Sequence, residues 1–239
     1  QVKLAARNVD ALIVNAAECE PLLHKDKEIL KHHTADFFKG LIASIDMTGA
    51  KTGYIGLKKK YHELLEYLEK AIPDKRIRML PLGDFYPAGD EYELVYEATG
   101  RLIPHGGIPL NIGCVVMNVE TALNVSRAAQ QPVTDKFLSV AGAVAEPISL
   151  CVPLGVTLAQ CVAAAGGPTV PDPNYVVGGV MMGRLEDNHN TLVDKTTGGV
   201  IVLQATDTLF LSAGISADAK GYRAGEGFCT TGLSANAGH

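Results

Sequence analysis

The strongest constraint on the fold is an alternation of short apolar runs with amphipathic stretches in the first third of the chain. The apolar runs at 9–14, 54–57 and 77–80 have the length and composition of buried strands. Between them, 25–46 and 61–72 carry apolar residues at helical spacing. Strand, helix, strand, helix, strand is the pattern of a parallel sheet covered by helices. We therefore predict an α/β fold for this part of the chain.

Polar loops follow three of the expected strands. Residues 15–20 follow the first strand, and 81–91 follow the third. Residues 118–121 follow a further apolar run at 112–117 and open another helical stretch. Ligands of parallel sheets bind beyond the carboxyl ends of the strands. We therefore expect the three loops to meet at one edge of the sheet and to form one site.

The composition changes near residue 132, after two glutamines and a proline. Short β-like runs at 137–140, 148–152 and 175–177 surround a helical stretch at 157–165, which indicates a small mixed α+β module. The end of the chain is rich in Gly, Ala and Ser. The predicted division is therefore a first domain at 1–131, a second at 132–205 and a weakly structured tail at 206–239.

Charge and composition exclude several classes of protein. The 239 residues carry a formal charge of -5 without a basic cluster, which argues against nucleic-acid binding. No stretch of about 18 apolar residues could span a bilayer, and no signal peptide is present. The five cysteines form no CxxC pair, so no zinc or iron–sulfur motif is seen, and we expect a reduced, intracellular protein. Because the chain opens with Gln1 rather than Met, we also expect a fragment.

Each loop allows a functional and a structural interpretation. The carboxylates of Glu18 and Glu20 could accept hydrogen bonds from cofactor hydroxyls, but a solvated turn explains these acidic residues equally well. Tyr86 could stack on a ring or pack as a half-buried tyrosine. Asn118 could cap a helix alone, or the helix N-terminus and Thr121 could address a flavin phosphate or ring edge. No nucleophile, general acid or metal ligand can be assigned from these patterns.

Taken together, the segments 12–21, 86–91 and 118–121 resemble a known flavin domain. It is shared by the 51-kDa flavoprotein of respiratory complex I, the C subunit of Rnf complexes and the cobalamin reductases of propanediol-utilising bacterial microcompartments. The segments 107–113, 178–183 and 195–199 also match the last group. Residues 133–180 resemble its soluble-ligand-binding β-grasp domain, and the likeness covers about 1–205.

This resemblance implies a Rossmann-like domain that binds FMN, followed by a β-grasp domain. It implies NADH as electron donor and a corrinoid or an electron-acceptor protein as recipient, in the cytoplasm and inside a microcompartment. The flavin would perform the chemistry, so no side chain need act as an acid or base. The implied FMN contacts are Lys3, Asn15, Glu18, Glu20, Tyr86, Gly89, Asp90, Glu91, Asn118, Glu120 and Thr121.

Two other functions stay open on the sequence alone. One is a subunit of an Rnf-type ferredoxin:NAD electron-transfer complex. The other is a β-grasp binding or docking module that is not itself catalytic. The sequence does not indicate an oligomeric state.

The sequence departs from the family pattern in three places. The family's Gly-rich loop, which would precede Val2, is missing, so we expect weakened FMN binding. Met117 stands where the family often has Asn, which removes one polar contact. The two four-cysteine motifs that hold 4Fe–4S clusters in the full-length family are absent, and only Cys229 lies beyond the matched region.

Overall fold

The computed structural model describes residues 2–204. Contacts divide the chain into two compact units, Gln1–Cys19 with Asp26–Val133, and Glu20–Lys25 with Thr134–His239. The predicted domain bounds of 1–131 and 132–205 stay a prediction, and the contact-based units differ from them by assigning Glu20–Lys25 to the second unit. The predicted tail at 206–239, with Cys229, lies outside the described residues.

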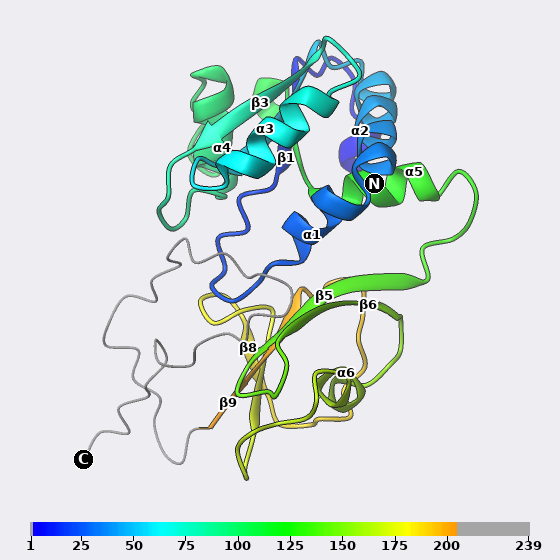
Figure 1. Cartoon of the computed structure of the whole chain (residues 1–239). Coiled ribbons are helices and arrows are strands. Elements are labelled where there is room, and N and C mark those ends of the chain that lie inside the picture. Colours follow the sequence, from blue (N-terminus) through cyan, green and yellow to red (C-terminus); the bar gives the residue numbers. More distant parts are fainter. Residues whose placement is uncertain (1, 205–239) are drawn as a thin grey trace. The chain divides into compact units, whose positions relative to one another are not determined.

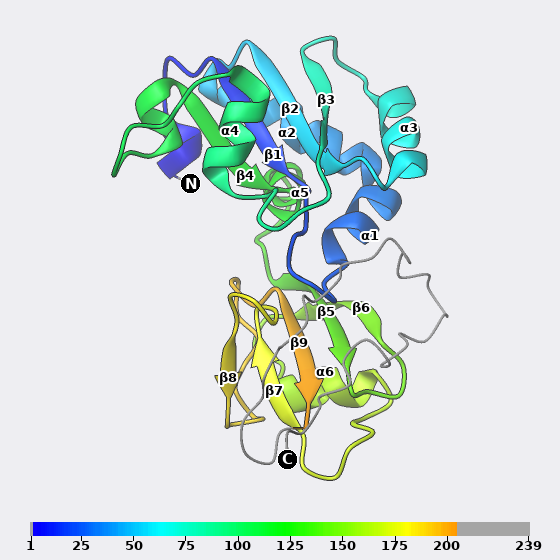
Figure 2. The ribbon, with the colours of Figure 1, turned by 90° about the vertical axis from the view of Figure 1, so that its left-hand side faces the viewer.

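The first unit contains a four-stranded parallel sheet (Figures 1 and 2). Its strands are β1 (Ala11–Asn15), β2 (Thr52–Lys58), β3 (Ile77–Leu82) and β4 (Cys114–Asn118). They lie in the order β3-β2-β1-β4. The central strand β1 is an almost continuous apolar run, as expected for a strand that is covered on both faces. The predicted α/β class is therefore confirmed.

Helices cover both faces of this sheet. Leu94 and Val95 of α4 pack against Ile13 and Val116 on one face, and Figure 2 shows α2 on the other. On that face Gly40 of α2 lies so close to α5 that a Cβ there would overlap the carbonyl oxygen of Ala122. The helices are η1 (Val2–Ala5), α1 (Lys25–His32), α2 (Thr34–Thr48), α3 (His62–Ala71), α4 (Glu91–Thr99), η2 (Pro109–Ile112) and α5 (Val119–Arg127).

The single helix predicted at 25–46 is wrong, because the structure has two helices there, α1 and α2. His33 separates them with φ -125° and ψ 28°, outside the helical region. Thr34 Oγ1 donates to the carbonyl oxygen of Leu30 at 2.7 Å, which satisfies one acceptor at the end of α1. The apolar spacing continues across this break, so periodicity alone does not reveal it.

The second unit contains a five-stranded mixed sheet in the order β6-β5-β9-β7-β8. Helix α6 (Leu158–Ala164) covers one face, where Leu158, Cys161 and Val162 pack against Leu138 and Val200. The other face is covered in part by a cluster that includes two leucines of the segment 20–25. The strands are β5 (Asp135–Gly142), β6 (Ile148–Pro153), β7 (Asn174–Val177), β8 (Arg184–Glu186) and β9 (Gly199–Leu203).

Membrane spans and metal clusters are both missing from the described part of the chain. Within residues 2–204, no helix is both long enough and apolar enough to cross a bilayer. In the same range, no group of three His, Cys, Asp or Glu side chains is arranged to hold a metal ion.

The close contact of α2 with α5 generates a stability prediction. We expect Gly40→Ala to lower the free energy of unfolding by about 3 kcal/mol, because the added methyl group collides with rigid helix backbone. Gly53→Ala is the matched control, since its Cβ would meet side-chain atoms alone, the nearest being the movable Cδ1 of Ile45 at 2.6 Å. Urea denaturation of both variants tests the prediction, and equal losses of stability would contradict it.

Candidate functional site

The strand order of the first unit reverses between β1 and β4. The chain runs outward from β1 through β2 to β3, and β4 then lies on the opposite side of β1. Asn15 and Asn118, the last residues of these strands, are partners in the parallel register. Ligands of open α/β sheets bind at this kind of crevice, beyond the carboxyl ends of the strands. The topology therefore locates a candidate site at these two asparagines.

The loops after β1 and β3 meet at this crevice, as the sequence predicted. Asn15 Nδ2 donates to the carbonyl oxygen of Gly89 at 2.7 Å, and Asn15 Oδ1 accepts from Ala17 N at 3.1 Å. Gly89 N donates in turn to Cys19 Sγ at 3.0 Å. A Cβ at Gly89 would lie 3.1 Å from both Asn15 Oδ1 and Ala17 Cβ, so glycine permits this close approach.

Lys3 connects three parts of the first unit. Its Nζ donates to Glu91 Oε1 at 2.7 Å and to the carbonyl oxygen of Val116 at 3.0 Å. Glu91 is the first residue of α4, and Asp90 caps that helix by accepting from Tyr92 N at 2.8 Å. The contacts bring Lys3 and Glu91 together and give Asp90 a structural role in capping α4. Because Lys3 pairs with Glu91, it offsets one negative charge near the crevice.

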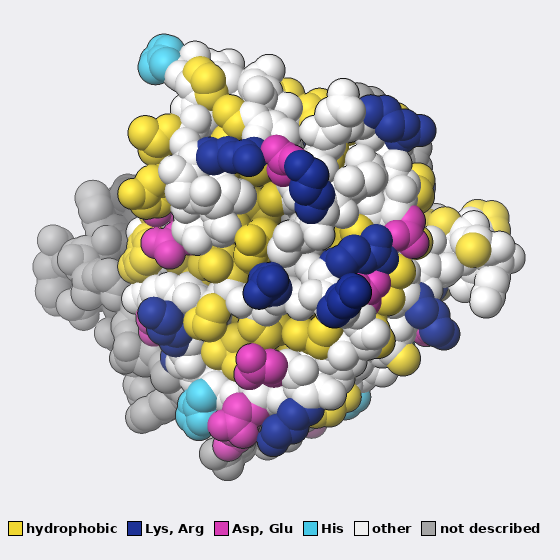
Figure 3. Space-filling model, turned by 90° about the horizontal axis from the view of Figure 1, so that it is seen from above, with side chains coloured by type: hydrophobic (Ala, Val, Ile, Leu, Met, Phe, Trp, Pro, Cys, Tyr) yellow, Lys and Arg dark blue, Asp and Glu magenta, His cyan; other side chains and the backbone are white. Residues whose placement is uncertain are grey.

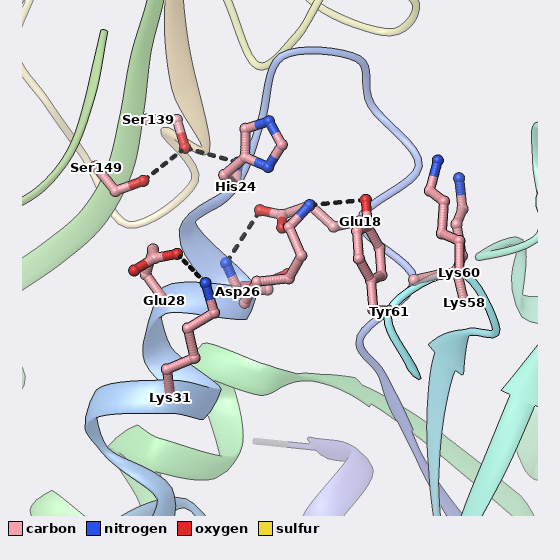
Figure 4. Close-up of polar contacts among 12 residues, drawn as sticks. Glu18, His24, Asp26, Glu28, Lys31, Lys58, Lys60, Tyr61, Ser139 and Ser149 are labelled. Atoms are coloured by element: carbon pink, nitrogen blue, oxygen red, sulfur yellow. Dashed lines mark hydrogen bonds and ion pairs between the residues drawn. The ribbon is translucent and has the colours of Figure 1, made fainter. Parts of the chain in front are cut away.

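Glu18 is buried in an ion pair within the first unit (Figure 4). Its Oε1 accepts from Asp26 N at 3.0 Å, and its Oε2 lies 3.5 Å from Lys27 Nζ. Lys27 also donates to Tyr61 Oη at 3.1 Å. Burial lowers the pKa of Lys27, but the charge of Glu18 opposes this and holds the pKa above its ordinary value. The Glu18 carboxylate is thus bound by the protein itself, at the start of α1.

Glu20 belongs to the second unit rather than to the first. Its Oε2 accepts from Met181 N at 3.0 Å, in the turn between β7 and β8. Its Oε1 is buried and has no hydrogen-bond partner among the described residues. Glu20 is thus held within the second unit, and its role in binding stays a prediction.

The remaining predicted contacts differ in exposure. Asn118 and Thr121 are exposed, Tyr86 is 44% exposed, and Glu120 is only 5% exposed. The side chain of Asn118 makes no capping hydrogen bond to α5, although it occupies the N-cap position. The side chain of Asn118 is therefore not used in capping, and the positive end of the α5 helix dipole lies beside the crevice. An amide and a helix N-terminus are suitable partners for ring edges and phosphate oxygens.

An open depression of about 740 Å³ lies at the opposite end of the sheet, beside Arg7 and Met47, where β1 and β2 begin. Figure 3 looks onto this end, where acidic and basic side chains are interspersed. Asp10 pairs there with Lys51 at 2.8 Å and Arg101 at 3.0 Å. A hydrogen bond from Lys51, supported by one from Arg101, lowers the pKa of Asp10. These charges satisfy one another, so the carboxyl ends of the strands are the better place for a ligand.

Sequence reasoning missed the basic residues at the edge that carries the site. Lys27 and Tyr61 contact each other next to Glu18, and Lys58 and Lys60 lie beside the same tyrosine (Figure 4). A signal was present, because three consecutive lysines, 58–60, follow the predicted strand at 54–57 directly.

Comparisons with known proteins match two domain families along the chain. The model of the Nuo51 FMN-binding domain matches residues 1–127, and that of the SLBB domain matches 137–185. A cobalamin reductase, PduS, of Citrobacter freundii is 45% identical over 210 residues, which cover 87% of this chain and 46% of that protein. The Na(+)-translocating ferredoxin:NAD(+) oxidoreductase complex of Acetobacterium woodii has a subunit that is 32% identical over 209 residues, covering 84% of this chain and 47% of that protein.

A solved structure supports the fold. The crystal structure of an NAD+-reducing [NiFe]-hydrogenase in the H2-reduced state matches with a TM-score of 0.69 and 24% identity, over 84% of this chain and 41% of that one. The chain spans about half the length of the curated relatives that it matches.

The buried pair of Glu18 and Lys27 generates a second prediction. We expect Lys27→Met to lower the free energy of unfolding by about 3 kcal/mol, because Glu18 would stay buried without its cation. Lys39→Met is the matched control, since the exposed pair of Lys39 and Asp36 contributes less than about 1 kcal/mol. Urea denaturation at neutral pH measures both losses.

The stabilisation that the ion pair of Lys27 with Glu18 provides should depend on pH in a defined direction. Because folding raises the pKa of Lys27, the stabilisation is complete below the unfolded value near 10.5 and disappears as the pH rises through the folded pKa. The stability difference between wild type and Lys27→Met should therefore persist at neutral pH and shrink only in strong alkali. A loss no larger than that of Lys39→Met would contradict the account.

Proposed function

Because the chain belongs to the family of the Nuo51 FMN-binding domain, we propose that it binds FMN between the carboxyl ends of β1 and β4 and carries electrons from NADH to an acceptor. The observation that supports this most is the pairing of Asn15 with Asn118 where the strand order reverses, within the matched domain. The family match is by itself sufficient to assign a flavin-binding domain of the kind found in complex I. The donor, the acceptor and the position of the flavin are our proposals.

The residues at the crevice are chemically suited to FMN. Asn118 and Thr121 are exposed beside the N-terminus of α5, where amide and hydroxyl groups can meet ring edges and a phosphate can meet helix N–H groups. Tyr86 offers an exposed aromatic face for stacking. Gly89 lets the backbone of its loop approach closely. Lys3 would offset the charge of Glu91 near an anionic cofactor.

The protein contributes binding and orientation in this proposal. FMN, when bound, supplies the capacity to accept a hydride and to release electrons singly. The hydrogen bonds of Asn15 and Cys19 with Gly89 fix the two loops that would hold the ring. The ion pair of Glu18 with Lys27 fixes the end of the first loop against α1. No side chain is required to move a proton, and so no catalytic residue is assigned.

The acceptor is proposed from the relatives. The name of the Citrobacter protein makes it a cobalamin reductase, which favours a corrinoid as acceptor for this chain as well. From the sequence resemblance, we also propose that this protein lies inside a bacterial microcompartment. The 4Fe–4S clusters of the full-length family stay a prediction from the sequence resemblance.

A second function is favoured by a separate observation. The 32% identity to a subunit of a Na(+)-translocating ferredoxin:NAD(+) oxidoreductase complex supports a role in an ion-translocating assembly of that type. The flavin site would be the same, and only the redox partner would differ. A β-grasp module that binds or docks without catalysis stays the third interpretation, and it requires no flavin.

Binding of FMN tests the proposed site. We expect the full chain to quench the fluorescence of FMN, and Asn118→Ala to weaken the affinity about fivefold, the effect of losing one hydrogen bond. Asn124→Ala is the matched control, because this asparagine lies on the same helix beyond the first turn. A chain that binds no FMN would contradict the proposal, as would equal affinities of Asn118→Ala and wild type.

The donor is tested on the FMN-loaded chain. Without oxygen, NADH should bleach the visible band of the bound flavin, and a cob(II)alamin or ferredoxin added afterwards should restore it. Restoration by cob(II)alamin alone favours the first function, and restoration by ferredoxin alone favours the second. A flavin that NADH leaves oxidised would contradict the proposed donor.

A further inference from the structure

Large apolar side chains are exposed on helix α4 and on the loop that follows it. Tyr92 and Tyr96, which lie one helical turn apart, are 47% and 51% exposed. In the loop, Leu102 is 76% exposed and Ile108 is 57% exposed. Figure 2 shows α4 in front of the sheet, on the outside of the first unit. A group of exposed apolar side chains on one surface is typical of a contact site for another molecule.

The helix and the loop form one continuous surface. The hydroxyl group of Tyr92 donates to the carbonyl oxygen of Gly107 at 2.9 Å, which places the tyrosine ring beside Ile108. Beneath this surface, Leu94 of α4 and Ile103 of the loop pack in the same buried cluster. We call the exposed residues of this surface the α4 face, and they are Tyr92, Glu93, Tyr96, Glu97, Leu102 and Ile108.

The α4 face carries negative charge. Glu93 and Glu97 are exposed, and neither makes an ion pair with any of residues 2–204. They lie four residues apart on the helix, where like charges repel each other. Glu93 is in the first turn of α4, where the helix dipole favours a carboxylate, but Glu97 is in the last turn, where the dipole disfavours one. The carboxylate of Glu97 therefore does not stabilise the helix that carries it.

We propose that the α4 face docks a protein whose contact surface is apolar at its centre and carries Lys and Arg at its rim. An apolar centre with a polar rim is the usual anatomy of a protein interface. Tyrosines contribute strongly to binding in such interfaces, so Tyr92 and Tyr96 are suited to the centre. Glu93 and Glu97 are complementary in charge to a basic rim and would steer the partner toward the tyrosines.

Other occupants suit this surface less. In a twofold contact between two copies of this chain, the same patch of each copy faces the other, so the carboxylates of Glu93 and Glu97 would repel their counterparts. An anionic lipid surface would repel these carboxylates as well. A basic protein surface is the occupant that both the apolar side chains and the charges favour.

The α4 face lies next to the proposed flavin site. Helix α4 begins with Glu91, whose carboxylate pairs with Lys3, and both residues belong to the proposed flavin contacts. A protein that carries the electron-acceptor group would therefore lie close to the flavin when it docks on the α4 face. Only this identification of the partner with the acceptor rests on the proposed function, and the docking surface does not.

Calorimetric titration of the full chain with cytochrome c, a basic haem protein, tests the charge of the α4 face. We expect binding at low ionic strength that weakens as salt is added. Glu97→Lys should weaken the affinity about tenfold, because it reverses a charge at the rim. Glu69→Lys is the matched control, because Glu69 is an exposed acid in the last turn of α3 and its substitution changes the net charge equally. This control should leave the affinity unchanged.

A second pair of variants tests the apolar centre. Leu102→Ser should weaken the affinity for cytochrome c about threefold or more, because a large exposed apolar side chain is lost from the contact. Met47→Ser is its matched control, since Met47 is 50% exposed at the opposite end of the sheet. Equal affinities of these two variants would overturn the proposed apolar centre.

Thermal melting shows that a loss of binding is not a loss of folding. Glu97→Lys should raise the melting temperature of the chain, because a lysine in the last turn suits the helix dipole and attracts Glu93. A chain that does not bind cytochrome c, or that binds it equally as Glu97→Lys and as Glu69→Lys, would overturn the proposal. Dimerisation of the chain, or its binding to phosphatidylserine vesicles, would overturn it in favour of that occupant if Leu102→Ser abolished the association.

Electron transfer from the FMN-loaded chain tests the identity of the partner. Each NADH supplies two electrons through the flavin, and each of two cytochrome c molecules takes up one. Glu97→Lys should slow this reduction without slowing the reduction of ferricyanide, a small acceptor that needs no docking surface. Unequal binding without an unequal rate would overturn the identification with the acceptor. If the chain binds cytochrome c as expected but binds no FMN, the proposed function fails while the docking surface stands.

Discussion

The parallel pairing of β1 with β4 is the constraint on which the site depends. Their register makes Asn15 and Asn118 neighbours although they are distant in sequence. The two strands pair in parallel from Ala11 with Cys114 to Asn15 with Asn118. The loops after β1 and β3 then meet, because Asn15 holds the carbonyl group of Gly89. The candidate site is therefore a consequence of sheet topology before any cofactor is considered.

The two ends of the sheet differ in how deeply their paired charged side chains are buried. At the amino end, Asp10 is shared by Lys51 and Arg101, and both cations are exposed. At the carboxyl end, Glu18 is buried against Lys27, and Lys58 is buried with a half-exposed carboxylate beside it. Buried charges cost stability unless they are compensated, and here each of these buried lysines has a carboxylate oxygen 3.5 Å away.

Sequence alone predicted the parallel sheet and the meeting of the loops after β1 and β3, because strand runs and helix periodicity are local signals. It failed at 25–46, since the apolar spacing continues through His33 while the backbone there leaves the helical region. It also missed β8, a strand of only three residues, and β9, whose partners β5 and β7 lie far back in the sequence.

Contacts between residues distant in sequence also limited what could be predicted of the candidate site. The sequence proposed Lys3 and Glu91, and the structure joins them in one ion pair. It could not show that Glu18 is bound by Lys27, or that the segment 20–25 packs with the second unit, because such contacts are set by tertiary packing. The lysines at 58–60 were visible in the sequence, but their burial was not.

The most direct measurement is the map of amide shifts on an isotope-labelled chain as FMN is added. Nuclear magnetic resonance resolves side-chain amides of asparagine as well as backbone amides. The account predicts that the largest shifts fall on the side-chain amides of Asn15 and Asn118 and on the backbone of Gly89. Shifts confined to Asp10, Lys51 and their neighbours, at the other end of the sheet, would contradict it.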